Sequence, residues 1–318
     1  MARNLMFFIL AILLPVQVQG QQPQIEQERQ QRSDPIRQQN LIGPRDLQVR
    51  DGQEMAPSSP GDSDIGVQRV MKRKKEVLNF SLFGDVSIYH TDNVALVRSR
   101  PVPENFMVGQ TGFSVTPEIL PGLFAEATIR QQWFRYDELI AFDFDSMNVG
   151  GGLSYLVPQL PGLVVFGRYN YNRLTYVHAN PDGAEGTEFF LNNTATFGLQ
   201  KIFPISKAHY VAVGHTSVLG WSDPVLPQRD EYSVFTSYNL KITRMLDSSV
   251  GYRASYITYN FGDREDLNHS FSGGLTFHPN KYFSVAANTS FGMNDSNMPQ
   301  FKYEVLNFGG GLSAKLRF

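Results

Sequence analysis

The last sixteen residues of the chain, 303–318, alternate between apolar and polar positions. The apolar set is Leu306, Phe308, Gly310, Leu312, Ala314, Leu316 and Phe318. The intervening set is Val305, Asn307, Gly309, Gly311, Ser313, Lys315 and Arg317. Successive side chains of a β-strand point to opposite faces, so this period of two predicts a strand with one apolar and one polar side.

Similar strand-like segments fill the chain from residue 77 onward. The full set of expected strands is 78–90, 106–117, 123–136, 146–157, 162–176, 189–203, 207–221, 231–244, 248–261, 267–278, 281–293 and 303–318. A tilted strand needs about 9–11 residues to cross a bilayer, whereas most strands of globular domains have about 5–6. The lengths of these segments therefore favour strands that cross a membrane.

The connections between these segments alternate in length. The longer ones are 91–105, 137–145, 177–188, 222–230, 262–266 and 294–302. The shorter ones are 118–122, 158–161, 204–206, 245–247 and 279–280. Bacterial membrane barrels have even strand numbers, short periplasmic turns and longer exterior loops. The sequence predicts an all-β fold over 77–318: a transmembrane up-and-down antiparallel β-barrel of about twelve strands, with both ends periplasmic.

A hairpin repeat offers a different interpretation. The segments TPEILPGLFAEATI and VPQLPGLVVFGRY share Pro, Leu-Pro-Gly and an apolar strand start. A repeat of roughly 40 residues is also typical of β-propellers. Propeller blades use shorter strands and lack the terminal aromatic residue, so the barrel is the favoured architecture.

The residues before the barrel divide into two zones. Residues 1–20 have a basic start, an apolar run and a small-residue site, which is typical of a signal peptide. Residues 21–76 are rich in Gln and contain no aromatic residue, which predicts a disordered periplasmic linker. Its basic run, 72–75, is either a solvated cluster or a contact for anionic lipid headgroups or a polyanion.

Composition excludes several classes of protein. The formal net charge of −2 is unsuited to a nucleic-acid binder, which needs a basic surface to neutralise phosphates. The absence of cysteine removes disulfides and thiolate chemistry. A mean hydropathy of −0.26 does not exclude a membrane barrel, because such a barrel keeps half of its strand residues in a polar interior.

Taken together, the alternating strands, the absent cysteines and the ending LSAKLRF resemble Gram-negative outer-membrane β-barrels. The resemblance implies residence in the cell outer membrane, contact with outer-membrane lipid and recognition by the barrel-assembly machinery. Leu316 and Phe318 would form the assembly signal, although Leu316 stands where many such proteins carry Tyr. The opening FGDVSIYHTDNVAL is similar to the first strand of the loosely defined beta-barrel porin families.

The polar faces of the expected strands carry ions of both signs. We predict that the lumen is lined by Asp85, Glu126, Arg130, Arg168, Lys241, Arg253, Lys315 and Arg317. These side chains would either border an aqueous path for small polar solutes or pair with one another and close the lumen. Side chains that border an aqueous path would make the protein a passive porin-like channel without a cofactor. Side chains that pair with one another would make it a closed structural barrel.

The opposite faces are apolar and would contact lipid. Aromatic residues lie toward the strand ends, where amphipathic rings favour the headgroup level. We expect interfacial girdles, with a sugar-binding aromatic slide as the alternative, made of Trp133, Phe134, Tyr136, Tyr171, Tyr176, Trp221, Tyr232, Tyr256 and Tyr259.

One pair of residues suggests catalysis. His215 and Ser217 share a strand face and resemble the His-x-Ser pair of outer-membrane lipid hydrolases, in which His activates a Ser nucleophile. Those families have Asn directly after the Ser, whereas Val218 follows here, and no residue for orienting the His is evident. No metal-ligand spacing or phosphate-binding motif is present in the sequence, so we predict that the protein is not an enzyme.

Overall fold

The computed structural model describes residues 79–178, 184–206 and 208–318. The predicted signal peptide at 1–20 and the predicted linker at 21–76 lie outside these residues. Within them, no helix is long and apolar enough to cross a membrane.

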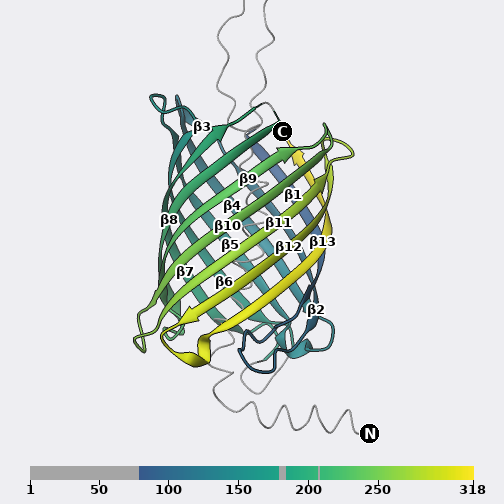
Figure 1. Cartoon of the computed structure of the whole chain (residues 1–318), viewed down its shortest axis with the longest axis vertical. Helices are drawn as coiled ribbons and strands as arrows, with labels where there is room; N and C mark the ends of the chain where they lie inside the picture. The colour runs from purple at the N-terminus through teal and green to yellow at the C-terminus, as the bar shows by residue number, and fades with distance from the viewer. Residues whose placement is uncertain (1–78, 179–183, 207) are drawn as a thin grey trace, which may run out of the picture.

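Twelve long antiparallel strands form a closed barrel (Figure 1). Their bounds are β1 Phe80–Thr91, β2 Glu104–Val115, β4 Leu123–Tyr136, β5 Phe144–Leu156, β6 Leu163–Tyr176, β7 Glu188–Pro204, β8 His209–Asp223, β9 Arg229–Lys241, β10 Leu246–Tyr259, β11 Glu265–Phe277, β12 Phe283–Ser296 and β13 Tyr303–Arg317. A short strand, β3 (Glu118–Leu120), adds to β4 in the connection after β2. Two 3₁₀ turns, η2 (Ile140–Phe142) and η3 (Pro299–Phe301), complete the regular structure of the described residues.

Each long strand pairs with its neighbours in sequence, and β1 closes the sheet by pairing with β13. The predicted architecture and strand count are therefore confirmed. Every expected strand coincides with an observed one, and the ends differ by at most three residues. The largest shifts are at β9, which ends at Lys241 rather than 244, and at β12, which ends at Ser296 rather than 293.

The two rims of the barrel differ. The C-terminus and β3 lie at one rim, which we call the turn end (Figure 1). Its connections include 157–162, 205–208, 242–245 and 278–282. The opposite rim, the loop end, holds 92–103, 137–143, 177–187, 224–228, 260–264 and 297–302. The predicted strict alternation in length is wrong: only 92–103 and 177–187 are clearly longer than the turn-end connections, whereas 137–143 has the same length as 116–122, which joins β2 to β4 at the turn end.

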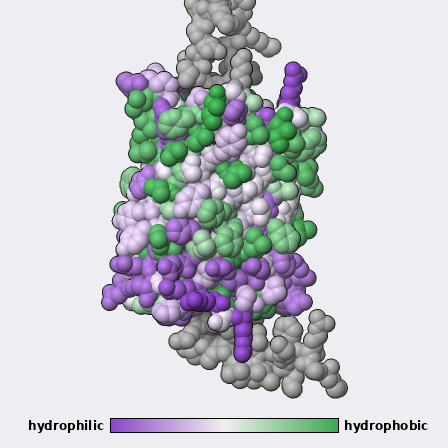
Figure 2. Space-filling view, in the orientation of Figure 1, coloured by the Kyte–Doolittle hydropathy of each residue, from purple (hydrophilic) through white to green (hydrophobic). Residues whose placement is uncertain are grey.

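Side chains alternate across the barrel wall as the sequence pattern requires. Outward residues such as Ile88, Val250 and Leu312 are at least 60% exposed, whereas inward Ser87 is buried. Figure 2 shows apolar residues distributed over the visible outer surface and a hydrophilic band near the loop end. A closed sheet satisfies its backbone hydrogen bonds internally, and its apolar exterior suits the hydrocarbon of a bilayer.

Inward glycines accept aromatic rings from the neighbouring strand. Phe166 pairs in register with Gly198, and Phe235 pairs in register with Gly214. A Cβ atom at Gly198 would lie 2.8 Å from the carbonyl oxygen of His215 and 2.9 Å from Cε2 of Phe166. The missing side chain therefore lets the ring lie flat against the inner wall.

We predict that Gly198→Ala lowers the free energy of unfolding by about 1–3 kcal/mol, because the added methyl group overpacks this contact. Urea unfolding of the purified barrel in detergent would measure the change. The matched control is Gly273→Ala on the outer face of β11, where the nearest atom is Thr289 Cγ2 at an ordinary 3.5 Å. Equal losses for both variants would contradict the proposed packing.

Candidate functional site on the inner wall

All eight predicted lumen residues lie on the inward face of the barrel. The pairings that place them include Asp85 with Gln110, Arg130 with Gly112, Lys241 with Asp247, Arg253 with Phe235, Lys315 with Phe83 and Arg317 with Ser81. Paired residues of antiparallel strands share one face of the sheet, and these neighbours are out of phase with the exposed apolar positions. The structure thus gives the eight residues a common surface, and their role in transport stays a prediction.

Glu126 and Arg168 form an ion pair across an intervening strand. Arg168 Nε lies 2.8 Å from Glu126 Oε2, and its Nη2 donates to Oε1 at 3.2 Å. Glu126 is in register with Gly152 of β5, which is in register with Arg168 of β6. Because Gly152 has no side chain, the two charged groups meet above it. Ser154 also donates a hydrogen bond to Glu126, and both ionic side chains keep about a quarter of their surface exposed.

Glu231 organises a second charged group on the opposite part of the wall. Its Oε1 accepts hydrogen bonds from Ser233 at 2.7 Å and Ser255 at 3.0 Å. Arg253 Nη1 approaches the same oxygen at 3.8 Å. Arg253 is one of the predicted lumen residues, whereas Glu231 is not among them. Its spacing to inward Phe235, four residues along the same strand, could have revealed it.

Carboxamides continue the polar wall between β1 and β6. Gln110 donates to Asp85, and Gln132 Nε2 donates to Gln110 Oε1 at 3.2 Å. On the next pair of strands, Ser146 donates to Asn172 Oδ1 at 2.9 Å. This part of the wall therefore offers donors and acceptors that are already connected to one another.

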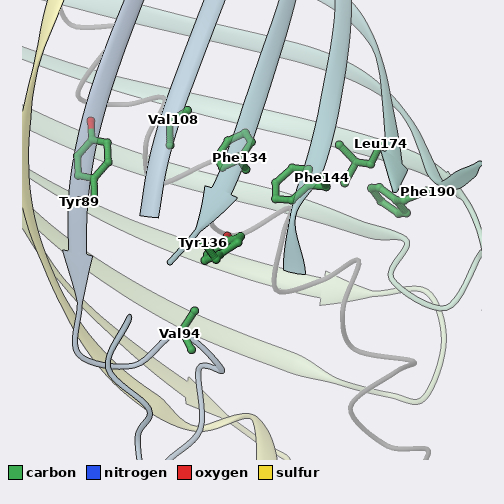
Figure 3. Packing of buried hydrophobic residues seen from close by; sticks show 8 residues of the cluster. All are labelled: Tyr89, Val94, Val108, Phe134, Tyr136, Phe144, Leu174 and Phe190. Carbon is green, nitrogen blue, oxygen red and sulfur yellow. The ribbon is translucent and has the colours of Figure 1, made fainter. Parts of the chain in front are cut away.

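An apolar cluster covers the inner wall at the loop end. Its buried members are Tyr89, Val94, Val108, Phe134, Tyr136, Phe144, Leu174 and Phe190 (Figure 3). The rings of Phe134 and Phe144 stack with centroids 4.3 Å apart. Apart from Val94, which lies in the connection 92–103, these side chains come from successive strands.

The expected aromatic girdle is wrong at four of its residues. Phe134, Tyr136, Tyr176 and Tyr259 point inward, because their register partners include inward Val108, Phe106, Phe144 and Arg229. Trp221, Tyr232 and Tyr256 remain exposed on the outer face, as expected for interfacial rings. Proximity to a strand end favours an aromatic residue without determining which face it occupies.

The connection 92–103 is fastened to the barrel by a buried amide. Asn93 donates to the carbonyl oxygens of Val97 at 2.7 Å and Glu304 at 2.8 Å. Its own Oδ1 accepts from the backbone N–H of Val97 at 3.1 Å. Val94 joins the apolar cluster on one side, while Leu96 packs with Tyr303 and Val305 of β13 on the other. This connection therefore joins two parts of the loop end.

The His215–Ser217 pair lies on the outer face, halfway along β8. His215 is in register with Leu199 and Val234, and its Nε2 lies 2.9 Å from Ser217 Oγ. In the part of the chain that the structure describes, no carboxylate or carboxamide hydrogen-bonds the other ring nitrogen. The geometry satisfies two polar groups that face lipid, and it lacks the third group that orients a catalytic His.

We predict that Asn93→Ala loosens the connection 92–103 and leaves the strands intact, because three hydrogen bonds of one side chain are lost. Hydrogen exchange of the amides in 92–103 should accelerate about tenfold, at a cost of about 1.4 kcal/mol in local opening. Asn105→Ala, which removes an exposed side-chain bond to His90 at 2.8 Å, is the control. Unchanged exchange in Asn93→Ala would show that the amide does not hold the connection.

Comparisons with known proteins agree with this fold. No family model matches the chain, and no curated protein matches its sequence. An outer membrane channel from Pseudomonas putida F1 has 8% identity and a TM-score of 0.52, covering 77% of this chain and 100% of that one. The beta domain of the Bordetella autotransporter Brka has 10% identity and a TM-score of 0.47, covering 75% and 100%. The predicted fold class is confirmed, and the fold with its apolar exterior assigns the chain to the outer membrane.

Proposed function

We propose that the chain is a passive channel for small polar solutes, with the loop end outside the cell and the turn end in the periplasm. The inward charged side chains carry this proposal, because they remain partly exposed inside a barrel whose outer surface is apolar. Glu126 and Arg168 are each 24% exposed, and Arg253 is 33% exposed. Charged side chains are costly inside a membrane unless they border water or pair with one another.

The size of the barrel and its structural neighbour support a path through the lumen. Barrels of about eight strands are filled by side chains, whereas those of 16–18 strands leave wide channels. Twelve strands lie between these limits. The Pseudomonas neighbour with a TM-score of 0.52 is itself described as an outer membrane channel.

The packed loop end favours a second candidate, a barrel that is closed at rest. Phe134, Phe144 and Phe190 are fully buried there, and Val94 packs against them. In that case the inward charges would stabilise the wall without lining a path. Conductance measurements distinguish the two candidates.

For the channel, we predict discrete conductance steps in planar bilayers and a cation preference after Arg168→Gln. The substitution leaves the Glu126 carboxylate without its partner. A unit charge about 4 Å from a passing ion is worth about 1 kcal/mol in water, which favours a cation about fivefold and disfavours an anion about fivefold, so the cation-to-anion permeability ratio rises by up to about 25-fold. Reversal potentials in a salt gradient measure this ratio.

Two controls sharpen the experiment. The double variant with Glu126→Gln and Arg168→Gln should restore the original ratio. Arg173→Gln, in the outward pair with Glu188, should leave the ratio unchanged. Wild-type protein without conductance would favour the closed barrel. Phospholipid turnover that disappears in Ser217→Ala would instead identify a lipid hydrolase.

We also propose that the barrel-assembly machinery reads Phe318 and Leu316. The backbone of Phe318 exchanges two hydrogen bonds with Phe80, at 3.0 and 3.1 Å, whereas its ring is exposed on the outer face. The backbone of this residue therefore contributes to closure, and its ring is left available for recognition.

We predict that Phe318→Ala lowers the outer-membrane yield several-fold while changing the free energy of unfolding by less than about 1 kcal/mol, since the exposed ring buries little surface. Phe308→Ala is the matched control, because Phe308 is an equally outward and exposed ring of β13. Immunoblots of membrane fractions measure the yield. Equal yields for both variants would contradict the assembly role.

A further inference from the structure

The inner wall is divided into regions of different chemistry. On β11, β12 and β13, the inward positions between Asp266 and Lys315 carry no charged residue. Six of them form what we call the amide–hydroxyl ladder: Asn268, Ser270, Ser272, Asn288, Ser290 and Asn307. Neighbouring members are in register, as with Ser272 and Ser290, and then Ser290 and Asn307.

The ladder borders accessible space inside the barrel. Asn268, Ser270, Ser272, Asn288 and Asn307 are all partly exposed. Inward glycines alternate with them at positions 274, 292, 309 and 311. Because the side chains of this wall are short, it leaves more room in the lumen than the wall covered by the apolar cluster.

Two charged groups on the other walls are paired locally. Glu126 pairs with Arg168, and Glu231 faces Arg253 while accepting two serine hydroxyls. Opposite charges held a few ångströms apart produce a weak field at a distance in water. A charged solute passing along the ladder therefore finds no counter-charge on that wall to replace its hydration.

We propose that the ladder is the solute path and that the solutes it favours are neutral polyhydroxylated molecules, such as uncharged sugars and polyols. This inference rests on the channel proposed above and names its substrate class. A hydroxyl group donates and accepts hydrogen bonds, and so do the side chains of Asn and Ser. Such a solute exchanges bonds with water for similar bonds with the wall, one at a time. The net gain is small, which lets the solute enter and also leave.

The first test compares three molecules of similar size that differ in charge: sorbitol, gluconate and glucosamine. Proteoliposomes containing the full chain would be placed in isotonic solutions of each, and their swelling rates recorded. We expect sorbitol to enter several-fold faster than either charged molecule. Equal rates for all three would overturn the inference while leaving the channel intact. The absence of swelling and of ion conductance would contradict the channel itself.

The second test places one charge on the ladder. Asn288→Asp should raise the entry of glucosamine relative to gluconate several-fold and shift the reversal potential toward cation preference. Asn288→Gln, which keeps the carboxamide, should leave both properties near those of the wild type. Asn148→Asp adds the same charge on β5, where Asn148 is inward, partly exposed and in register with Arg130.

The comparison between the two Asp variants locates the path. A path along the ladder predicts a large effect of Asn288→Asp and a small effect of Asn148→Asp. Equal effects of the two substitutions, or a larger effect at Asn148, would overturn the assignment of the path to β11–β13. Circular dichroism and the heat-dependent gel mobility of each variant would verify that the barrel has folded.

Discussion

The pairing of β1 with β13 is the constraint on which the rest of the structure depends. The pairing of these two strands runs from Ser81 opposite Arg317 to Thr91 opposite Asn307 and leaves no long strand with a free edge. A sheet in lipid must satisfy its backbone groups in this way. Once the sheet is closed, the choice of which side chains of one strand point inward determines, through the registers, which side chains of every other strand point inward. The inward positions of Asp85 and Lys315 follow from this closure.

The sequence predicts this part of the structure well because lipid imposes a simple rule on one face of each strand. Outward positions must be apolar over the thickness of the hydrocarbon, and the period of two then determines which positions point inward. The rule tolerates exceptions such as Phe83 and Tyr89, which are aromatic and inward. It placed all eight charged residues on the inner face, although it gives no information about which charges meet.

Two features that the sequence did not reveal depend on relations between strands or loops. The Glu126–Arg168 pair requires Gly152 to lie between its partners, and this alignment is known only once the register of β4, β5 and β6 is known. The burial of Val94 requires knowledge of where its connection folds. The inward turn of Phe134 follows directly from the outward facing of Trp133, since neighbouring residues of a strand cannot share a face. That signal was available in the sequence.

In a narrow barrel, close packing of side chains and the proposed passage of a solute oppose each other, and different parts of the inner wall suit each of them. Filling the lumen with aromatic rings gives close packing, and the rings at the loop end meet this demand together with those seated on Gly198 and Gly214. The proposed passage of a solute requires short side chains that hydrogen-bond weakly, and the inner faces of β11–β13 carry such side chains in Ser, Asn and Gly. Closure makes the division possible, because hydrogen bonds between strands hold the wall wherever side chains are small. In such a barrel, the selectivity of the proposed path would change through a few inward residues while the outer surface and the strand registers remain the same.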